Sequence, residues 1–342
     1  MSKRSRRKKE KISSMKQTQP SHIEGDSKKT APEQEHTHNY EGKKYSKIVR
    51  FYDRHYLWLL IIPVLLLAAA LVQIGIQTAQ TGDFIQKGIS LKGGVTITIA
   101  TDKIIDTAGL KSELLSQFPK LDASVRTLTS AGQSVGYVIE ADLQNSADID
   151  KGISIVETYT GIDKKEFGIE TIQPSLGASF FEEVAIAMLV AFAFMAIVVF
   201  LTFRTFVPSF AAVFSVFSDM VITLAVVNLL GIKVSSAGIA AFLMLIGYSI
   251  DTDILLSTRV LKREEGSVLD RILSSVKTGL TMAGTTIVAA IIAFIFTESE
   301  TLKQIMLIIL IGLFVDIFNT WLQNAAILRW YVEHRGKKHG KA

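Results

Sequence analysis

Six separate runs of apolar residues, each long enough to cross a lipid bilayer as a helix, constrain this chain more than any other feature. Lipid offers the backbone no hydrogen-bond partners, so each run is predicted to be helical. The runs cover residues 57–77, about 184–203, 206–230, 235–257, 279–297 and 304–328. The pattern therefore predicts an α-helical polytopic membrane protein with six transmembrane helices.

A polar region, residues 78–182, separates the first apolar run from the second. Its residues alternate between strand-like and helix-like patterns in the order βαββαβ, which is typical of an α+β ferredoxin-like domain. Strands are expected at 89–101, 124–129, 135–141 and 167–173, and helices at 107–118 and 147–159. Gly93 and Gly94 interrupt the first strand, which indicates a bulge or a close approach of another backbone segment.

The distribution of positive charge indicates how the chain crosses the membrane. Six spans put both termini on one side, and Lys and Arg are concentrated in the tails and in the loops near Arg204 and 259–277. Because basic loops stay in the cytosol, we expect both termini there and the ferredoxin-like domain to be extracytoplasmic. The predicted divisions are a basic disordered tail at 1–56, a helix at 57–77, the domain at 78–182, a five-helix bundle at 183–329 and a basic tail at 330–342.

Composition and motifs exclude several classes of function. The chain contains no cysteine, so disulfides, thiolate catalysis and thiolate metal sites are excluded. The sequence has no metal-ligand cluster, nucleophile and base pairing or phosphate-binding loop, so we expect neither an enzyme nor a bound cofactor or metal. The net charge of +5 lies mainly in tails and short loops, which suits lipid headgroups and favours no specific nucleic acid.

The third and sixth apolar runs each carry one carboxylate near the middle. Asp219 has Ser215 and Thr223 four residues to either side, so one stripe of its helix is polar. Asp316 is followed three residues later by Asn319, and Thr320 and Gln323 continue the same stripe. These residues predict two polar seams inside the membrane.

The fourth apolar run carries two further carboxylates, Asp251 and Asp253. Small residues such as Gly247 let another helix approach closely, and Asp251, one turn later, is expected to look into that contact. Asp253 faces away from Asp251 and could snorkel or cap a helix end. A charge at the bilayer centre costs roughly 2.5 to 3.5 kcal/mol, and these helices offer no central Lys or Arg as a partner, so protonation is the cheaper alternative.

Two interpretations of these carboxylates stay open. Asp219, Asp251 and Asp316, with Asp253 and Asn319, could form a proton relay whose protonation is linked to helix movement. They could instead only hold helices together through hydrogen bonds. A purely structural scaffold, in which the carboxyl groups never titrate, is a further alternative.

Three sequence motifs together indicate a particular protein family more specifically than any single carboxylate does. They are GISLKGGVTI at 88–97, QPSLG at 173–177 and IGYSIDTDILLSTRVLKR at 246–263. With these motifs the chain, from about residue 50 to 330, resembles the SecF family of protein-export membrane proteins in its archaeal, separate-chain form. The resemblance marks Gly93, Gly94, Pro174, Gly177, Gly247 and Tyr248 as structural motif residues.

The resemblance implies an auxiliary of the Sec protein-export machinery, a half-transporter of the resistance-nodulation-division superfamily. Its expected partners are a SecD-like six-span subunit, the SecY channel, the translocating polypeptide and membrane lipids. Bacterial members usually read Asn-Asp-Thr where this chain has Asp251, Thr252 and Asp253. The alternative is a self-contained proton-driven exporter of small molecules or lipids.

Overall fold

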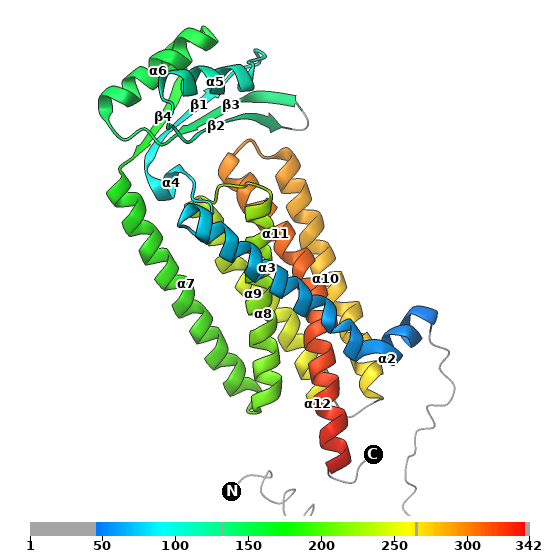
Figure 1. Ribbon diagram of the computed structural model, residues 1–342. Coiled ribbons are helices and arrows are strands. Elements are labelled where there is room, and N and C mark those ends of the chain that lie inside the picture. Colours follow the sequence, from blue (N-terminus) through cyan, green and yellow to red (C-terminus); the bar gives the residue numbers. More distant parts are fainter. Residues whose placement is uncertain (1–45, 131–132, 264–265, 339–342) are drawn as a thin grey trace, which may run out of the picture. The chain divides into compact units, whose positions relative to one another are not determined.

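The computed structural model describes residues 46–130, 133–263 and 266–338. Within these ranges, six helical segments are long and apolar enough to cross a membrane. They are α3 (Ile61–Thr81), α7 (Pro174–Phe203), α8 (Phe206–Leu229), α9 (Ser236–Lys262), α10 (Val268–Phe296) and a last segment that begins with α11 (Glu300–Phe318) and ends at Arg335. The prediction of six membrane helices is therefore confirmed (Figure 1).

Helices also occupy parts of the chain that the charge pattern predicts to be tails. A helix, α2, covers Lys47–Leu59, within and just beyond the expected disordered segment 1–56. Another, α12 (Ala325–Lys338), runs through most of the expected tail 330–342. Residues 1–45 and 339–342 lie outside the described part. Both helices carry aromatic side chains that pack or hydrogen-bond, and charge patterning alone does not reveal such contacts.

The polar region forms one antiparallel sheet with two helices on one face (Figure 1). The elements follow in the order β1 (Gly94–Ala100), α5 (Thr107–Gln117), β2 (Ala123–Ser130), β3 (Gln133–Ala141), α6 (Ser146–Thr160) and β4 (Phe167–Ile172). The spatial order β2-β3-β1-β4 is the predicted ferredoxin-like arrangement. Alternate β1 residues Val95, Ile97 and Ile99 point into the core beneath the helices, where Leu110 and Val156 cover them.

One boundary of this sheet differs from the prediction. Residues Ile89–Lys92 form a short helix, α4, and the first strand begins only at Gly94. Gly93 ends α4 with φ of 85°, a conformation that favours glycine. A Cβ on Gly93 would lie 2.5 Å from the Pro174 Cα, and one on Gly94 would lie 2.4 Å from the Ala141 carbonyl oxygen. Of the two alternatives expected at this glycine pair, the structure has the close backbone approach.

Gly177 completes the same joint. A Cβ on this residue would lie 3.0 Å from the carbonyl of Leu91 and 3.1 Å from the Gly93 nitrogen. The motif residues of α4 and of the first turn of α7 therefore pack backbone against backbone. This joint fixes the point at which the chain leaves the sheet domain and enters the second membrane helix.

Polar contacts join the sheet domain to the connecting loops of the membrane helices. The backbone of Gly88 donates to the Val234 carbonyl at 2.8 Å, and Val234 donates to Gln86 at 2.7 Å. Lys233 forms an ion pair of 2.5 Å with Asp122. The domain therefore contacts the bundle at the end where α8 leads into α9.

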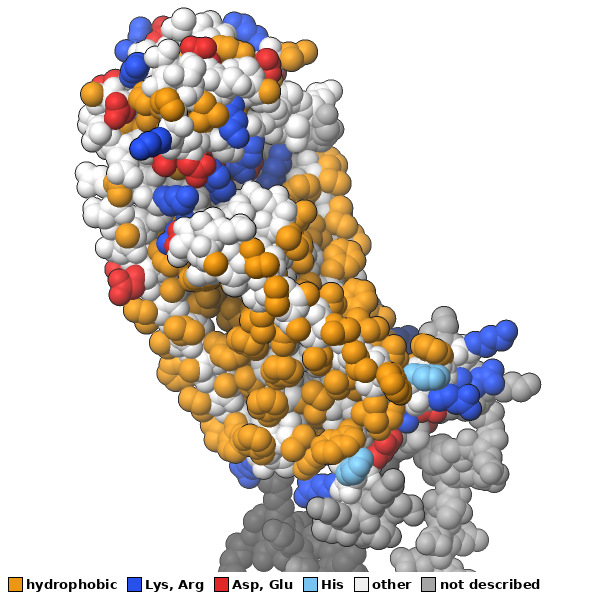
Figure 2. Space-filling model, viewed as in Figure 1, with side chains coloured by type: hydrophobic (Ala, Val, Ile, Leu, Met, Phe, Trp, Pro, Cys, Tyr) orange, Lys and Arg blue, Asp and Glu red, His pale blue; other side chains and the backbone are white. Residues whose placement is uncertain are grey.

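Burial divides the membrane helices into an inner and an outer group. In the most apolar window of each helix, 56% of α8, 50% of α9 and 44% of the last segment are buried, against 17% of α3, 6% of α7 and 17% of α10. Figure 2 shows hydrophobic side chains covering the helical part, while charged side chains gather on the sheet domain and at the opposite end. The three inner helices are therefore where a polar group is shielded best.

Candidate functional site

A cluster of buried polar side chains lies between α8, α9 and the last helical segment, and we call it the polar seam. Each of its members is at most 1% exposed. They are Ser215, Ser218, Asp219 and Thr223 of α8, Ser249, Asp253 and Ser257 of α9, and Asp316, Asn319, Thr320, Gln323 and Asn324 of the last segment. The polar residues of each helix recur at spacings of three or four, which keeps them on one face.

Asp219 joins all three helices of the polar seam. Its Oδ2 accepts a hydrogen bond from the Ser249 hydroxyl of α9 at 2.5 Å. Its Oδ1 accepts from the Asn319 side-chain amide at 2.7 Å. One carboxyl group of α8 is therefore held by a donor from each neighbouring helix.

Asp253 and Asp316 share a donor. The Thr320 hydroxyl lies 3.0 Å from Asp316 Oδ1 and 3.2 Å from Asp253 Oδ1, so it bridges the two carboxyl groups. The Asn324 side-chain amide also donates to Asp253 Oδ1, at 2.7 Å. The second oxygen of Asp253 has no hydrogen-bond partner among the described residues.

A short π-helix places the donors of the last segment. Residues Asn319–Asn324 form this element, η2, between α11 and α12. A π-helix widens the turn, so residues that an α-helix would spread around its circumference gather on one side, and such turns are frequent at functional sites. Asn319, Thr320 and Asn324 consequently all reach carboxylates of the polar seam.

Among the described residues, no ion pair neutralises the carboxyl groups of Asp219, Asp253 and Asp316. Across residues 46–130, 133–263 and 266–338, each ion pair that includes a Lys or Arg lies outside the polar seam. In the same ranges no group of three His, Asp or Glu is arranged to hold a metal ion. A carboxylate buried without a partner charge is costly, so hydrogen bonds and protons are what can stabilise these groups.

The structure separates Asp251 from the other predicted site residues. Asp219, Asp253, Asp316 and Asn319 lie together in the polar seam, whereas Asp251 is exposed on the opposite side of α9. The helix that Asp251 is expected to meet near Gly247 is not one of the described helices of this chain, because no atom of another described helix lies within 4 Å of the Gly247 Cβ position. The expectation that Asp253 could snorkel or cap a helix end is wrong, because Asp253 is fully buried.

Asp251 belongs to an exposed stripe of α9, which we call the outer stripe. It comprises Ala240, Met244, Gly247, Tyr248 and Asp251, at the spacings of one helical face. Met244 is 44% exposed and Tyr248 is 38% exposed, although both lie within a membrane helix. The motif residues Gly247 and Tyr248 therefore shape this surface and take no part in the polar seam.

Sequence reasoning missed four residues of the polar seam, which are Ser218, Ser249, Ser257 and Asn324. Ser249 lies four residues before Asp253, so the same helical spacing that linked Ser215 to Asp219 could have found it. Asn324 lies four residues after Thr320, so the same spacing could have found it too, although nothing in the sequence signals the π-helix that carries its side-chain amide.

Comparisons with known proteins find a family that this chain matches. The family model described as "Protein export membrane protein SecD/SecF, C-terminal" matches residues 153–334. The chain is 37% identical over 292 residues to the protein-export membrane protein SecF of Pyrococcus furiosus, which covers 83% of this chain and 92% of that protein. It is 41% identical over 286 residues to the SecF of Methanocaldococcus jannaschii, with 81% and 96% covered.

A solved structure is similar as well. The crystal structure of SecDF, a translocon-associated membrane protein from Thermus thermophilus, matches with a TM-score of 0.66 and 18% sequence identity. The match covers 85% of this chain and 39% of that one, so this chain spans well under half of the length of that SecDF chain. At this identity the likeness shows a shared fold.

Proposed function

Because the chain belongs to the SecF family of protein-export membrane proteins, we propose that it works with a SecD-like six-span subunit and couples export to a proton gradient through the polar seam. The chain is a multi-pass membrane protein with an auxiliary role in protein export. The proposal adds the partner, the SecY channel beside which the pair acts on a translocating polypeptide, and the proton. It includes no enzymatic reaction.

The observation that carries the proton step is the burial of Asp219, Asp253 and Asp316 without a cation from the described residues to balance them. A proton that binds such a carboxyl group removes its charge and turns an acceptor into a donor. Asp253 Oδ2 lacks a donor among the described residues, so a proton bound there would turn an unpaired acceptor into a donor. Because donors from three helices meet at these groups, protonation would alter how the helices hold one another.

The outer stripe of α9 supports the proposal of a SecD-like partner. A carboxylate such as Asp251 on an uncovered membrane face would stand against lipid, at a cost of roughly 2.5 to 3.5 kcal/mol. A neighbouring subunit that covers the stripe removes that cost, and Gly247 permits a close approach between helices. The chain also corresponds in fold to 39% of a SecDF chain, which is consistent with one half of a two-part assembly.

The orientation follows from charge. Arg204, which ends α7, and Arg259, Lys262 and Arg263, which end α9, gather where membrane helices finish. We place this end and both termini in the cytosol, and the domain at 78–182 on the extracytoplasmic side. There the sheet domain could meet a polypeptide as it emerges.

Export under an imposed proton gradient tests the proposal. Membrane vesicles from cells that carry only Asp253→Asn should export a secreted protein at the rate seen without a gradient. The matched control, Asp148→Asn, changes a partly exposed carboxylate at the start of α6, outside the membrane helices, and should keep the gradient-dependent rate. Equal stimulation by the gradient in both variants would refute the coupling, provided that both proteins accumulate to the same level.

A further inference from the structure

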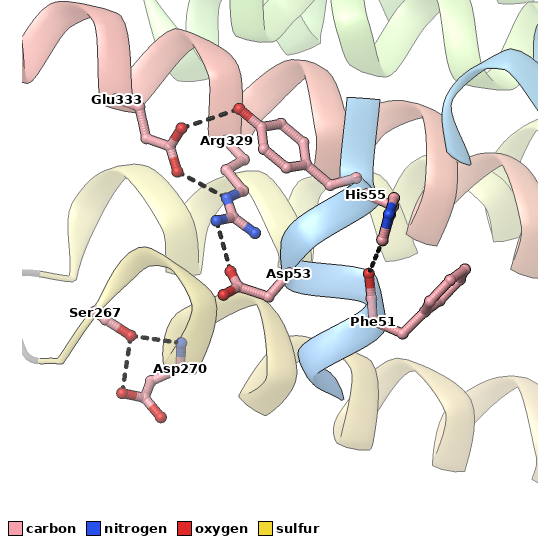
Figure 3. Close-up of polar contacts among 8 residues, drawn as sticks. Phe51, Asp53, His55, Ser267, Asp270, Arg329 and Glu333 are labelled. Carbon is pink, nitrogen blue, oxygen red and sulfur yellow. Dashed lines mark hydrogen bonds and ion pairs between the residues drawn. The ribbon is translucent and has the colours of Figure 1, made fainter. Parts of the chain in front are cut away.

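The helix α2 presents two different faces. Its inner face docks on the last helical segment: the Tyr52 hydroxyl donates to the Trp321 carbonyl at 3.1 Å, and the Tyr56 hydroxyl donates to Glu333 at 2.9 Å. Arg329 pairs with Asp53 at 2.6 Å and lies 4.2 Å from the centre of the Tyr56 ring. Figure 3 shows Arg329 reaching both Asp53 and Glu333.

The inner face is therefore fixed in place. Burial raises the pKa of Tyr52 to about 12, against the opposing effect of Arg329, so this tyrosine remains a neutral donor. At His55 the backbone leaves the helical conformation (φ −119°, ψ 18°), which kinks α2 between the docked residues Tyr52 and Tyr56. The helix thus lies at the membrane boundary with its outer face turned away from the protein.

The outer face carries three cations that have no acidic partner in the part of the chain that the structure describes. Lys47, Arg50 and Arg54 follow one another at spacings of three and four, so they share one side of α2. All three are exposed, and none forms an ion pair with an acidic group among the described residues. They line a shallow hollow of about 590 Å³, and its one carboxylate, that of Asp53, is already paired with Arg329.

Large apolar side chains continue the same face toward the membrane. Phe51 is 58% exposed and stacks on His55, with 4.8 Å between the ring centres. Leu57 is 50% exposed and Trp58 72% exposed, immediately before the first span begins at Ile61. A helix with cations at one level and exposed aromatic side chains next to them fits the boundary between lipid headgroups and acyl chains.

We propose that Lys47, Arg50 and Arg54 form a binding site for the phosphate of an anionic phospholipid, with Phe51 and Trp58 resting against its acyl chains. Arg guanidinium groups bind phosphate oxygens through two parallel hydrogen bonds, and Lys contributes a point charge. A nucleic acid would satisfy the cations but leave Phe51, Leu57 and Trp58 in water. A lipid satisfies both the charges and the apolar surface.

Lipid retention by the full-length chain tests this site. The purified protein in detergent receives equal amounts of phosphatidylglycerol and phosphatidylcholine, and native mass spectrometry counts the molecules retained. The triple variant Lys47→Gln, Arg50→Gln, Arg54→Gln should bind phosphatidylglycerol about fivefold more weakly for each charge removed. The control Lys111→Gln, Lys164→Gln, Lys165→Gln removes the same charge from exposed positions of the sheet domain and should retain the lipid like the unaltered chain.

A second readout reports the position of the lipid. Brominated phosphatidylglycerol should quench the fluorescence of Trp58, measured as the difference between the unaltered chain and Trp58→Phe, and quench it less in the triple variant. Phosphatidylcholine with the same bromination should quench weakly in both. Three results would overturn the site: equal retention by the triple variant and its control, displacement of the lipid by millimolar inorganic phosphate, or displacement by a short RNA.

Discussion

Asp251 and Asp253 lie two residues apart in α9, yet Asp253 is fully buried against Asn324 and Thr320 whereas Asp251 is exposed on the other side of the helix. The helix α9 thus presents the carboxyl group of Asp253 to the inside of the bundle and that of Asp251 to the outer stripe. The inner carboxyl groups meet donors from three helices. The outer one is left exposed by the described helices of this chain.

The bridge between Asp253 and Asp316 depends on the Thr320 hydroxyl. We expect Thr320→Val, which keeps the shape and removes this donor, to lower the free energy of unfolding by about 1 to 3 kcal/mol, because two buried acceptors lose a partner. Urea titration of the detergent-solubilised chain measures the change. Thr202→Val is the control, because its exposed hydroxyl donates only to a carbonyl of its own helix. Equal destabilisation by the two variants would show that the bridge contributes no more to stability than a hydrogen bond within one helix.

Crosslinking tests whether the outer stripe faces a partner. The chain has no native cysteine, so Met244→Cys provides a unique thiol on the outer stripe and Val190→Cys a comparably exposed one on α7. In native membranes, Met244→Cys should crosslink to a SecD-like chain and Val190→Cys should not. Capture of a second copy of this chain alone would instead favour a self-contained exporter.

The joint between α4 and α7 tolerates no side chain on its glycines. Gly93→Ala should destabilise the chain by about 1 to 3 kcal/mol, because the new Cβ meets Pro174 and the backbone keeps a positive φ. Gly75→Ala is the control, since its Cβ position has no atom within 4 Å. Thermal unfolding should separate the two variants clearly. A melting temperature for Gly93→Ala equal to that of the control would contradict the close approach.

The contact between the sheet domain and the bundle should weaken in acid. Burial alone would raise the pKa of Asp122, but Lys233 and Lys92 outweigh it and hold that pKa below the usual 3.8. A carboxyl group whose pKa falls on folding stabilises the fold above its ordinary pKa, and this contribution is lost as pH drops through the lowered value. Hydrogen exchange in the Lys233 loop should therefore increase below about pH 3.8 in the unaltered chain, and this step should be missing in Asp122→Asn. An increase in hydrogen exchange of equal size in both proteins would show that other titrating groups cause it.

Helical periodicity alone predicted much of the polar seam. Asp219, Asp316 and Asn319 recur with polar neighbours at spacings of three and four, and such spacing fixes a shared face whatever surrounds the helix. The choice between Asp251 and Asp253 could not be made in this way. The two side chains point about 200° apart, so one of them must face outward, and which one depends on neighbouring helices that the sequence of α9 does not describe.

Local backbone geometry accounts for the other differences. The strand expected at 89–101 begins instead at Gly94, because Gly93 takes a positive φ that ends a turn of helix. The fold of the domain was nevertheless predictable, since its alternating patterns specify the order of strands and helices. The docking of α2 depends on Tyr52 and Tyr56 meeting residues more than 200 positions away, and composition near the N-terminus carries no sign of it.

Proton movement through the assembly is the most direct test of the role proposed for the polar seam. Liposomes that contain this chain with its SecD-like partner and the SecY channel, and a dye that reports internal pH, are exposed to an inward proton gradient while a polypeptide is exported. Proton entry should be fast in the unaltered pair and in Asp148→Asn, and should fall to the rate of protein-free liposomes in Asp219→Asn and Asp253→Asn. Entry at the unaltered rate in both polar-seam variants, with the proteins folded and paired, would contradict the claim that these buried carboxyl groups carry the proton.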